Sequence, residues 1–243
     1  MSRLVSFSIG QSWFSQASIT FMPILLYFIL LLLPLRALAS FELPVAQFSL
    51  ESVTSWQVKH FVGRTQYVVV PFDGQRVLKA TSNDSATIIT KPIRIDLEET
   101  PYLNWSWRVE DQLSGINETT KSGDDFAARI YLVIGDNLLN PATKAINYVW
   151  SSNQPRYSRW SNPFAGDKVQ MIAVRGATDT ISQWRKEKRN VYKDLINVFG
   201  DKGSEHKNRK AYRYLDAIAI MTDSDNSGQA ATAYYGDIFF STK

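Results

Sequence analysis

The sequence predicts a mainly β protein, a jelly-roll-like antiparallel β-sandwich with one amphipathic helix. Short apolar segments are separated by turn residues along most of the chain. Tyr67–Val70 and Val77–Leu78, for example, flank the turn signal Asp73–Gly74. Several segments alternate between apolar and polar residues, as strands with one buried face do. Many short strands of this kind are typical of sandwiches and jelly rolls and not of parallel α/β sheets.

The strand pattern recurs from residue 53 to residue 241. In one segment the alternation places Trp105 and Trp107 on an apolar face, and Asn104 and Arg108 on the opposite, polar face. We expect strands in 53–59, 66–70, 76–80, 87–90, 102–110, 126–134, 145–151, 169–175, 215–222 and 231–241.

One segment departs from the strand period. From Trp184 onward, apolar residues including Val191, Leu195 and Phe199 recur at three- and four-residue steps, with basic residues between them. We predict one amphipathic helix here, ended by Gly200 or Gly203. Its basic side fits a solvated face better than a surface for an anionic polymer or a membrane.

The N-terminus has the pattern of a secretory signal peptide. Arg3 precedes a long apolar segment at 21–33, and Ala37–Ala39 forms a small-x-small cleavage site. An uncleaved membrane anchor is the alternative, but the apolar segment is shorter than the roughly 20 residues that a bilayer needs. We therefore expect a signal peptide at 1–39, one domain at 40–243, and a periplasmic or secreted protein.

Composition removes several classes of function. Without residues 1–39 the chain has 25 basic and 23 acidic residues, so it lacks the concentrated positive charge expected of a nucleic-acid binder. It has no cysteine, which excludes disulfides, thiolate metal sites and a cysteine nucleophile. No G-x-S-x-G elbow, P-loop or dinucleotide fingerprint is present.

One predicted strand follows an acidic turn and carries charged residues. Its apolar face starts at Phe126, whereas Asp125 and Arg129 fall on the other face. Asp124 lies beside them, and we expect Arg108 to project from another strand onto the same polar face. Carboxylates beside guanidinium groups form charge-assisted bonds and keep low pKa values. This favours a structural clamp, or a site for a polyhydroxylated or carboxylated ligand, over a general acid.

A second acidic segment resembles part of a calcium loop. Asp223, Asp225, Ser227 and Gly228 match positions one, three, five and six of an EF-hand loop. Position twelve is Tyr234 instead of the bidentate glutamate, so we favour a hairpin turn, with an irregular Ca²⁺ site as the alternative. No other cofactor is expected.

The aromatic residues suggest a sugar-binding surface. Aromatic rings can stack on sugars while neighbouring polar side chains bind the hydroxyl groups. Trp105, Trp107 and Trp150 fall on apolar strand faces and are expected in the core. Tyr157 and Trp160, in the loop that follows, are the better candidates for contact with a ligand.

Several motifs, in order, resemble one family of secreted bacterial proteins, domain of unknown function 3047. They are Trp105-x-Trp107-Arg108, Asp124-Asp125-x-Ala127-Ala128-Arg129, Tyr148-Val149-Trp150, the 184–200 segment, and Thr222–Gly228 followed by Tyr235-Gly236-Asp237-Ile238. The resemblance implies one domain and supplies no catalytic assignment.

Three functional hypotheses follow. The first is a non-catalytic binding domain for a carbohydrate or another polar envelope ligand. The second is a carbohydrate-active enzyme whose acids include Asp124, Asp125, Asp223 or Asp225, since acid-pair chemistry depends on a spatial gap that the sequence does not give. The third is a structural envelope protein without a small ligand. We expect a membrane contact only through the N-terminal segment.

Overall fold

The structure is a computed structural model that describes residues 41–135 and 143–243. Contacts divide the chain after Ala39, and all described elements belong to the unit Ser40–Lys243. The predicted signal peptide lies outside the described residues. Among those residues, no helix has both the length and the apolar character needed to cross a bilayer.

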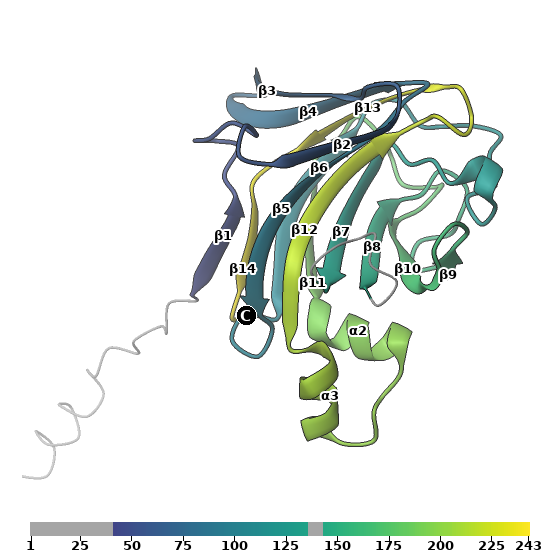
Figure 1. Ribbon diagram of the computed structural model, residues 1–243. Helices are drawn as coiled ribbons and strands as arrows, with labels where there is room; N and C mark the ends of the chain where they lie inside the picture. Colours follow the sequence, from purple (N-terminus) through teal and green to yellow (C-terminus); the bar gives the residue numbers. More distant parts are fainter. Residues whose placement is uncertain (1–40, 136–142) are drawn as a thin grey trace, which may run out of the picture. The chain divides into compact units, whose positions relative to one another are not determined.

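Two seven-stranded sheets form the framework (Figure 1). The first sheet contains β1 (Glu42–Ala46), β3 (Gln66–Phe72), β4 (Gln75–Asn83), β6 (Tyr102–Val109), β11 (Arg185–Asn190), β13 (Ala230–Tyr235) and β14 (Ile238–Ser241). The second sheet contains β2 (Gln57–Val62), β5 (Ala86–Asp96), β7 (Ala128–Ile134), β8 (Lys144–Trp150), β9 (Arg159–Asn162), β10 (Gly166–Arg175) and β12 (Tyr214–Asp223). The prediction of a mainly β sandwich is therefore confirmed.

The strand order places distant segments side by side. The first sheet runs β1-β14-β6-β13-β4-β3, with β11 paired to β6, and the second runs β2-β5-β12-β7-β8-β10-β9. All pairs are antiparallel except β8 and β10, which are parallel and are connected through the short strand β9. The second sheet is thus mixed, which the sequence pattern did not predict.

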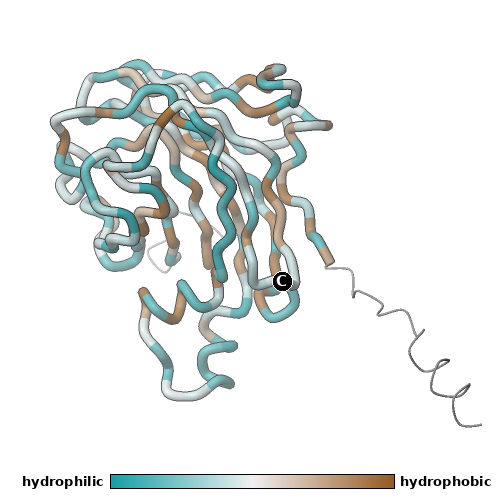
Figure 2. Tube along the Cα trace, turned by 180° about the vertical axis from the view of Figure 1, so that it is seen from behind, coloured by the Kyte–Doolittle hydropathy of each residue, from teal (hydrophilic) through white to brown (hydrophobic). Residues whose placement is uncertain are grey.

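The core lies between the two sheets and is formed by the inward faces of their central strands. Trp105 and Trp107 of β6 are buried in it, and the ring of Trp105 stacks on Tyr148 of β8 at a centroid distance of 5.5 Å. Figure 2 shows the corresponding alternation of hydrophobic and hydrophilic residues along the strands. Because truncation of a buried Trp to Ala costs roughly 3–5 kcal/mol, these rings are major contributors to stability.

Strand β7 begins two residues later than predicted. Ala128 and Ile130 enter the core, and Arg129 lies on the outer face, as the alternation predicts. Phe126 was expected on the core face, but it belongs to a separate outer cluster with Val149, Met171 and Ala173. The period-two pattern holds only within a strand, and residue 126 precedes this one.

The helix predicted from Trp184 is wrong in its first part. Residues 185–190 form strand β11, and helix α2 (Val191–Phe199) follows, with the Asn190 side chain accepting a hydrogen bond from the Lys193 N–H. Gly200, with a φ of 86°, ends the helix. A second helix, α3 (Glu205–Tyr212), follows it, whereas the sequence predicted only one helix. Both helices lie at the same end of the sheets (Figure 1).

Candidate functional site

A pocket with a volume of about 420 Å³ lies on the outer face of the second sheet. Strands β2, β5, β7, β12 and the β9–β10 hairpin contribute to it. Its polar lining consists of Asp124, Arg129, Asn162, Asp223, Asp225 and Asn226. Its apolar lining includes Phe61, Ile88, Tyr131, Phe164, Val169 and Met221. We call it the acidic pocket, because three carboxylates and one guanidinium line it.

The pair Arg129–Asp223 joins two neighbouring strands at this pocket. Arg129 of β7 donates from Nη2 to Oδ2 of Asp223, the last residue of β12. Both side chains are almost fully buried, with 3% and 1% of their surface exposed. The strand register brings Arg129 and Asp223 together. Arg129 is aligned with Met221 across the β7–β12 pair, and Asp223 lies two residues after Met221, on the same face of β12. The backbone N–H of Phe126 donates a hydrogen bond to Asp223 Oδ1 at 3.2 Å. The Arg129 guanidinium lies over the Phe126 ring, 5.1 Å from its centroid.

Several buried polar atoms at the pocket have no hydrogen-bond partner in the described part of the chain. They are Oδ1 of Asp124 and the Nε and Nη1 atoms of Arg129. Asp124 Oδ1 and Arg129 Nη1 are 3.7 Å apart, which is an ion-pair distance without a hydrogen bond. The other Asp124 oxygen accepts a hydrogen bond from Asn162 Nδ2 at 2.9 Å. Unsatisfied buried groups of this kind cost about 1–3 kcal/mol each, so a ligand that satisfies them gains affinity.

Asp125 has a different environment from its neighbour Asp124. It is fully buried, and its carboxylate accepts hydrogen bonds from the backbone N–H and the side chain of Asn226 and from the Ser227 N–H, at 2.7–3.2 Å. Asp125 therefore fixes the turn that follows β12 and does not line the pocket. A structural role accounts for all three contacts.

Burial dominates the electrostatics of the cluster. It raises the pKa of Asp223 well above the usual range; Arg129 opposes this shift, and Asp124 adds to it. Burial also raises the pKa of Asp124, again against Arg129, and raises that of Asp225, where Asp125 contributes in the same direction. Burial acts to lower the pKa of Arg129, but Asp223, Tyr131, Asp124 and Asp125 together outweigh it and raise this pKa, so the guanidinium stays charged.

The residues predicted to bind calcium are only partly brought together. Oxygens of Asp125, Asp223 and Asp225 lie within 4.8 Å of one another, which is close enough to share a cation. Ser227 is held in the turn, where its hydroxyl donates to the Ser224 carbonyl at 3.4 Å. The oxygens of Asp125 and Asp223 are already engaged, and Arg129 supplies the compensating charge. Ca²⁺ takes six to eight oxygen ligands, of which these carboxylates could supply only part, so the calcium site stays a prediction.

Arg108 does not join this site. It lies on β6, in the first sheet, where it pairs with Glu110 and stands 3.5 Å from Asp73 Oδ2. Its side chain points to the outer face of that sheet, so the core separates it from Arg129. The sequence shows that both residues face outward but not that they belong to different sheets.

The two predicted loop aromatics do not line the pocket either. Tyr157 is exposed, with Arg156 over its ring at 4.8 Å. Trp160 is half-buried, packs on Phe126 at 6.3 Å and donates from Nε1 to the Glu118 carbonyl at 3.2 Å. Trp160 therefore packs against Phe126, whose ring contacts the Arg129 guanidinium.

The pocket has two exposed aromatics that sequence reasoning missed. Phe61 of β2 and Phe164 of the β9–β10 hairpin are 53% and 58% exposed. Asn162, also missed, is buried and holds the hairpin with its Oδ1, which accepts the N–H groups of Phe164 and Ala165. A signal was present for Phe164, because it ends the aromatic loop that contains Tyr157 and Trp160. None was present for Phe61.

Comparisons with known proteins give one family and several distant folds. No curated protein sequence matches the chain. A family 11 carbohydrate-binding module from Clostridium thermocellum, solved with a β-1,3-1,4-mixed-linked tetrasaccharide, is similar at 10% identity and a TM-score of 0.40, covering 82% of this chain and 94% of the module.

A cellulase and an endoglucanase are also similar. A cellulase derived from the Cel12A cellulase of Rhodothermus marinus has 10% identity and a TM-score of 0.39, covering 82% of this chain and 98% of its own. Endoglucanase 3 of Trichoderma harzianum, from family GH12, has 9% identity and a TM-score of 0.33, with 79% and 99% covered. One family model, described as protein of unknown function (DUF3047), matches residues 54–239, so the chain belongs to the DUF3047 family.

Proposed function

We propose that this protein is a non-catalytic binding domain of the periplasm or the secreted fraction, and that its acidic pocket binds a neutral carbohydrate. One observation carries the proposal. Arg129 and Asp124 are both buried, both line the pocket, and both have polar atoms without a hydrogen-bond partner in the described part of the chain.

A sugar hydroxyl suits these atoms because it can donate and accept at once. It can accept from Nη1 or Nε of Arg129 while donating to Oδ1 of Asp124. Asp225 and Asn226, half-buried at the same pocket, offer further groups to neighbouring hydroxyls. The pairing requires no charge on the ligand.

The apolar part of the pocket suits the faces of a sugar ring. Phe61 and Phe164 line the pocket and are each more than half exposed, and aromatic rings are suited to stacking on a ligand. Small-molecule sites combine such apolar walls with a few placed polar groups, and a volume of about 420 Å³ lies within their usual range.

The charge of the pocket argues for a neutral ligand. Three carboxylates and one guanidinium line it, so an anionic ligand meets net repulsion. This favours a neutral ligand over one with a carboxylate or phosphate group at this pocket.

Binding is favoured over hydrolysis by the state of the carboxylates. A glycosidase needs two carboxyl groups free to act across the scissile bond. Asp223 is tied to Arg129, and Asp125 is fully buried with three hydrogen bonds from the turn. Neither is placed to exchange a proton with a substrate, so an enzyme would depend on the two remaining candidate acids, Asp124 and Asp225, which line the pocket.

The test is a screen of purified protein against neutral glycans, followed by calorimetric titration of the best binder. We expect Phe164→Ala to weaken binding about tenfold, the scale of one stacking anchor. Tyr157→Ala is the matched control, since Tyr157 is equally exposed, at 57%, and lies outside the pocket. Equal losses in both variants, or no binding to any neutral glycan, would contradict the proposal.

Mass spectrometry of the bound glycans separates binding from catalysis. We expect the glycan to be recovered intact after prolonged incubation. Cleavage products that disappear in Asp225→Asn, with affinity retained, would assign the pocket to an enzyme instead.

A further inference from the structure

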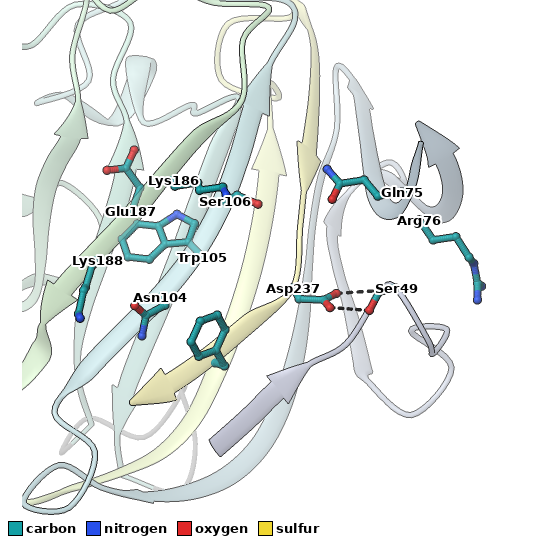
Figure 3. Close-up of a pocket in the computed structure, with 11 residues that line it drawn as sticks. Ser49, Gln75, Arg76, Asn104, Trp105, Ser106, Lys186, Glu187, Lys188 and Asp237 are labelled. Atoms are coloured by element: carbon teal, nitrogen blue, oxygen red, sulfur yellow. Dashed lines mark hydrogen bonds between the residues drawn. The ribbon is translucent and has the colours of Figure 1, made fainter. Parts of the chain in front are cut away.

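A second pocket, of about 440 Å³, lies on the outer face of the first sheet (Figure 3). Its charged and polar lining includes Arg76, Lys186, Lys188, Asn104, Ser106 and Asp237. We call it the lysine pocket. The core separates it from the acidic pocket, and its charge has the opposite sign.

The alternation of β11 places both lysines in this pocket. Lys186 and Lys188 are two residues apart in a strand, so they leave the same face of the strand, with their Cα atoms about 7 Å apart. They are aligned with Ser106 and Asn104 on β6. The residue between them, Glu187, points the opposite way and is buried.

Glu187 does not neutralise the lysines. Its Oε1 accepts hydrogen bonds from Trp107 Nε1 at 3.1 Å and from Arg175 Nε at 2.5 Å, so its charge is compensated on the inner side of the sheet. At the other side of the pocket, Asp237 accepts from the backbone N–H and the hydroxyl of Ser49 at 2.9 Å and 2.5 Å (Figure 3).

The three cations keep their charge available. Within residues 41–135 and 143–243, neither Lys186, Lys188 nor Arg76 forms an ion pair. Lys188 contacts only the ring of Tyr102, at 4.9 Å, and Arg76 donates to the Leu50 carbonyl at 3.5 Å. With Asp237 as the one uncompensated acid among the lining residues, the pocket has a net positive charge.

We propose that the lysine pocket binds the oxyanion of an acidic saccharide, a sugar that carries a carboxylate or a phosphate. The Lys186 ammonium, beside Ser106, offers several donors to an oxyanion, and Lys188 and Arg76 add positive charge from other parts of the pocket lining (Figure 3). The Ser106 hydroxyl, with no hydrogen bond to other described side chains, lies beside Lys186 and adds a neutral donor. Phe239 provides an apolar wall for the ring of the sugar.

The protein thus has two pockets for two kinds of ligand. The acidic pocket repels the group that the lysine pocket attracts. The inference is independent of the proposed function, because either pocket can bind its ligand if the other does not.

Another role for the lysines is protection of the sheet edge. Strand β11 pairs only with β6 among the described strands, and lysines on edge strands discourage pairing with a second chain. The two roles differ in what a loss of charge does. It abolishes anion binding in the first case and promotes self-association in the second.

The experiment titrates purified protein with trigalacturonate, glucose phosphate and maltotriose, at low and at physiological salt. The first two probes separate carboxylate from phosphate as the source of the oxyanion, and the third is neutral. We expect at least one anionic probe to bind, more weakly at the higher salt. In Lys186→Gln/Lys188→Gln, we expect its affinity to fall at least about tenfold.

The control is Lys193→Gln/Lys207→Gln, which removes the same charge from exposed positions on α2 and α3. We expect it to retain wild-type affinity within about twofold, since neither residue lines the lysine pocket. The proposal is overturned if neither anionic probe binds, if the Lys186/Lys188 variant binds like the wild type, or if the control loses as much. Self-association of the Lys186/Lys188 variant with unchanged anion binding would assign the lysines to edge protection.

Discussion

Replacing Arg129 with methionine removes the guanidinium that faces Asp223 and keeps most of the side-chain volume. Asp223, which is 1% exposed, then stays in the protein interior without its ion-pair partner. Removal of one member of a buried ion pair costs about 3–5 kcal/mol, because the remaining charge is uncompensated. Asp124, 3.7 Å from Arg129, loses its ion pair as well, so we expect the upper part of that range.

Urea unfolding measures this cost. In Arg129→Met we expect the loss to shrink as the pH falls from 7 toward 5, because burial already raises the pKa of Asp223 and a protonated acid is not a buried charge. In Arg129→Met/Asp223→Asn we expect most of the stability to return. Arg94→Met is the control, since its pair with Asp216 is exposed and contributes less than about 1 kcal/mol. A cost for Arg129→Met no larger than that of Arg94→Met, or additive effects in the double variant, would refute the reasoning.

Three further predictions concern the surroundings of the site. Burial raises the pKa of Glu118 from 4.5 to about 7, so this acid binds its proton more tightly in the folded state and stability should rise as the pH falls from about 7 toward 4.5. The free energy of unfolding should increase by roughly 3 kcal/mol over this pH range. Thermal melts of Glu118→Gln should not show this increase, and a pH dependence of stability like that of the wild type would count against the prediction. Gly123→Ala should lose about 1–3 kcal/mol, because an added Cβ meets the Asn117 carbonyl oxygen at 2.4 Å; urea unfolding checks this, with Ser122→Ala expected to be neutral. Millimolar CaCl₂ should leave the melting temperature as it is in EDTA, because Asp223 is already paired with Arg129 and Asp125 is already held by the turn; a clear rise would support the calcium site suggested by the sequence.

Much of the fold follows from residue periodicity. The alternation in β6 predicts which tryptophans enter the core, and that in β7 predicts that Arg129 faces outward. Alternation does not say which sheet a strand joins, so Arg108 was expected near Arg129 although β6 and β7 belong to different sheets. The parallel pair β8–β10 also depends on tertiary contacts that the pattern of one segment does not contain.

The misread β11 has a local explanation. Its residues are nearly all charged, so a strand with one apolar face cannot be recognised there. Glu187 occupies the inner face and is compensated by Arg175 and the indole of Trp107, whereas the lysines face outward. The partners of Glu187 are close only in the folded chain.

The candidate site was predicted in its charged part and missed in its apolar part. Asp124, Arg129 and Asp223 all line the acidic pocket. Phe61 comes from β2, which is more than 60 residues earlier than Arg129 in the chain, and only the strand order β2-β5-β12-β7 brings the two near each other. The spacing of residues along the sequence does not give the order of strands in the sheet.

Binding of a neutral carbohydrate at the acidic pocket is the central claim, and chemical-shift mapping of the backbone amides tests it most directly. On titration with the best neutral glycan from the screen, we predict the largest shifts at Phe164, Ala165, Asp225 and Asn226. Shifts centred on Ser106, Lys186 and Lys188 instead, or no shifts at saturating glycan, would contradict it.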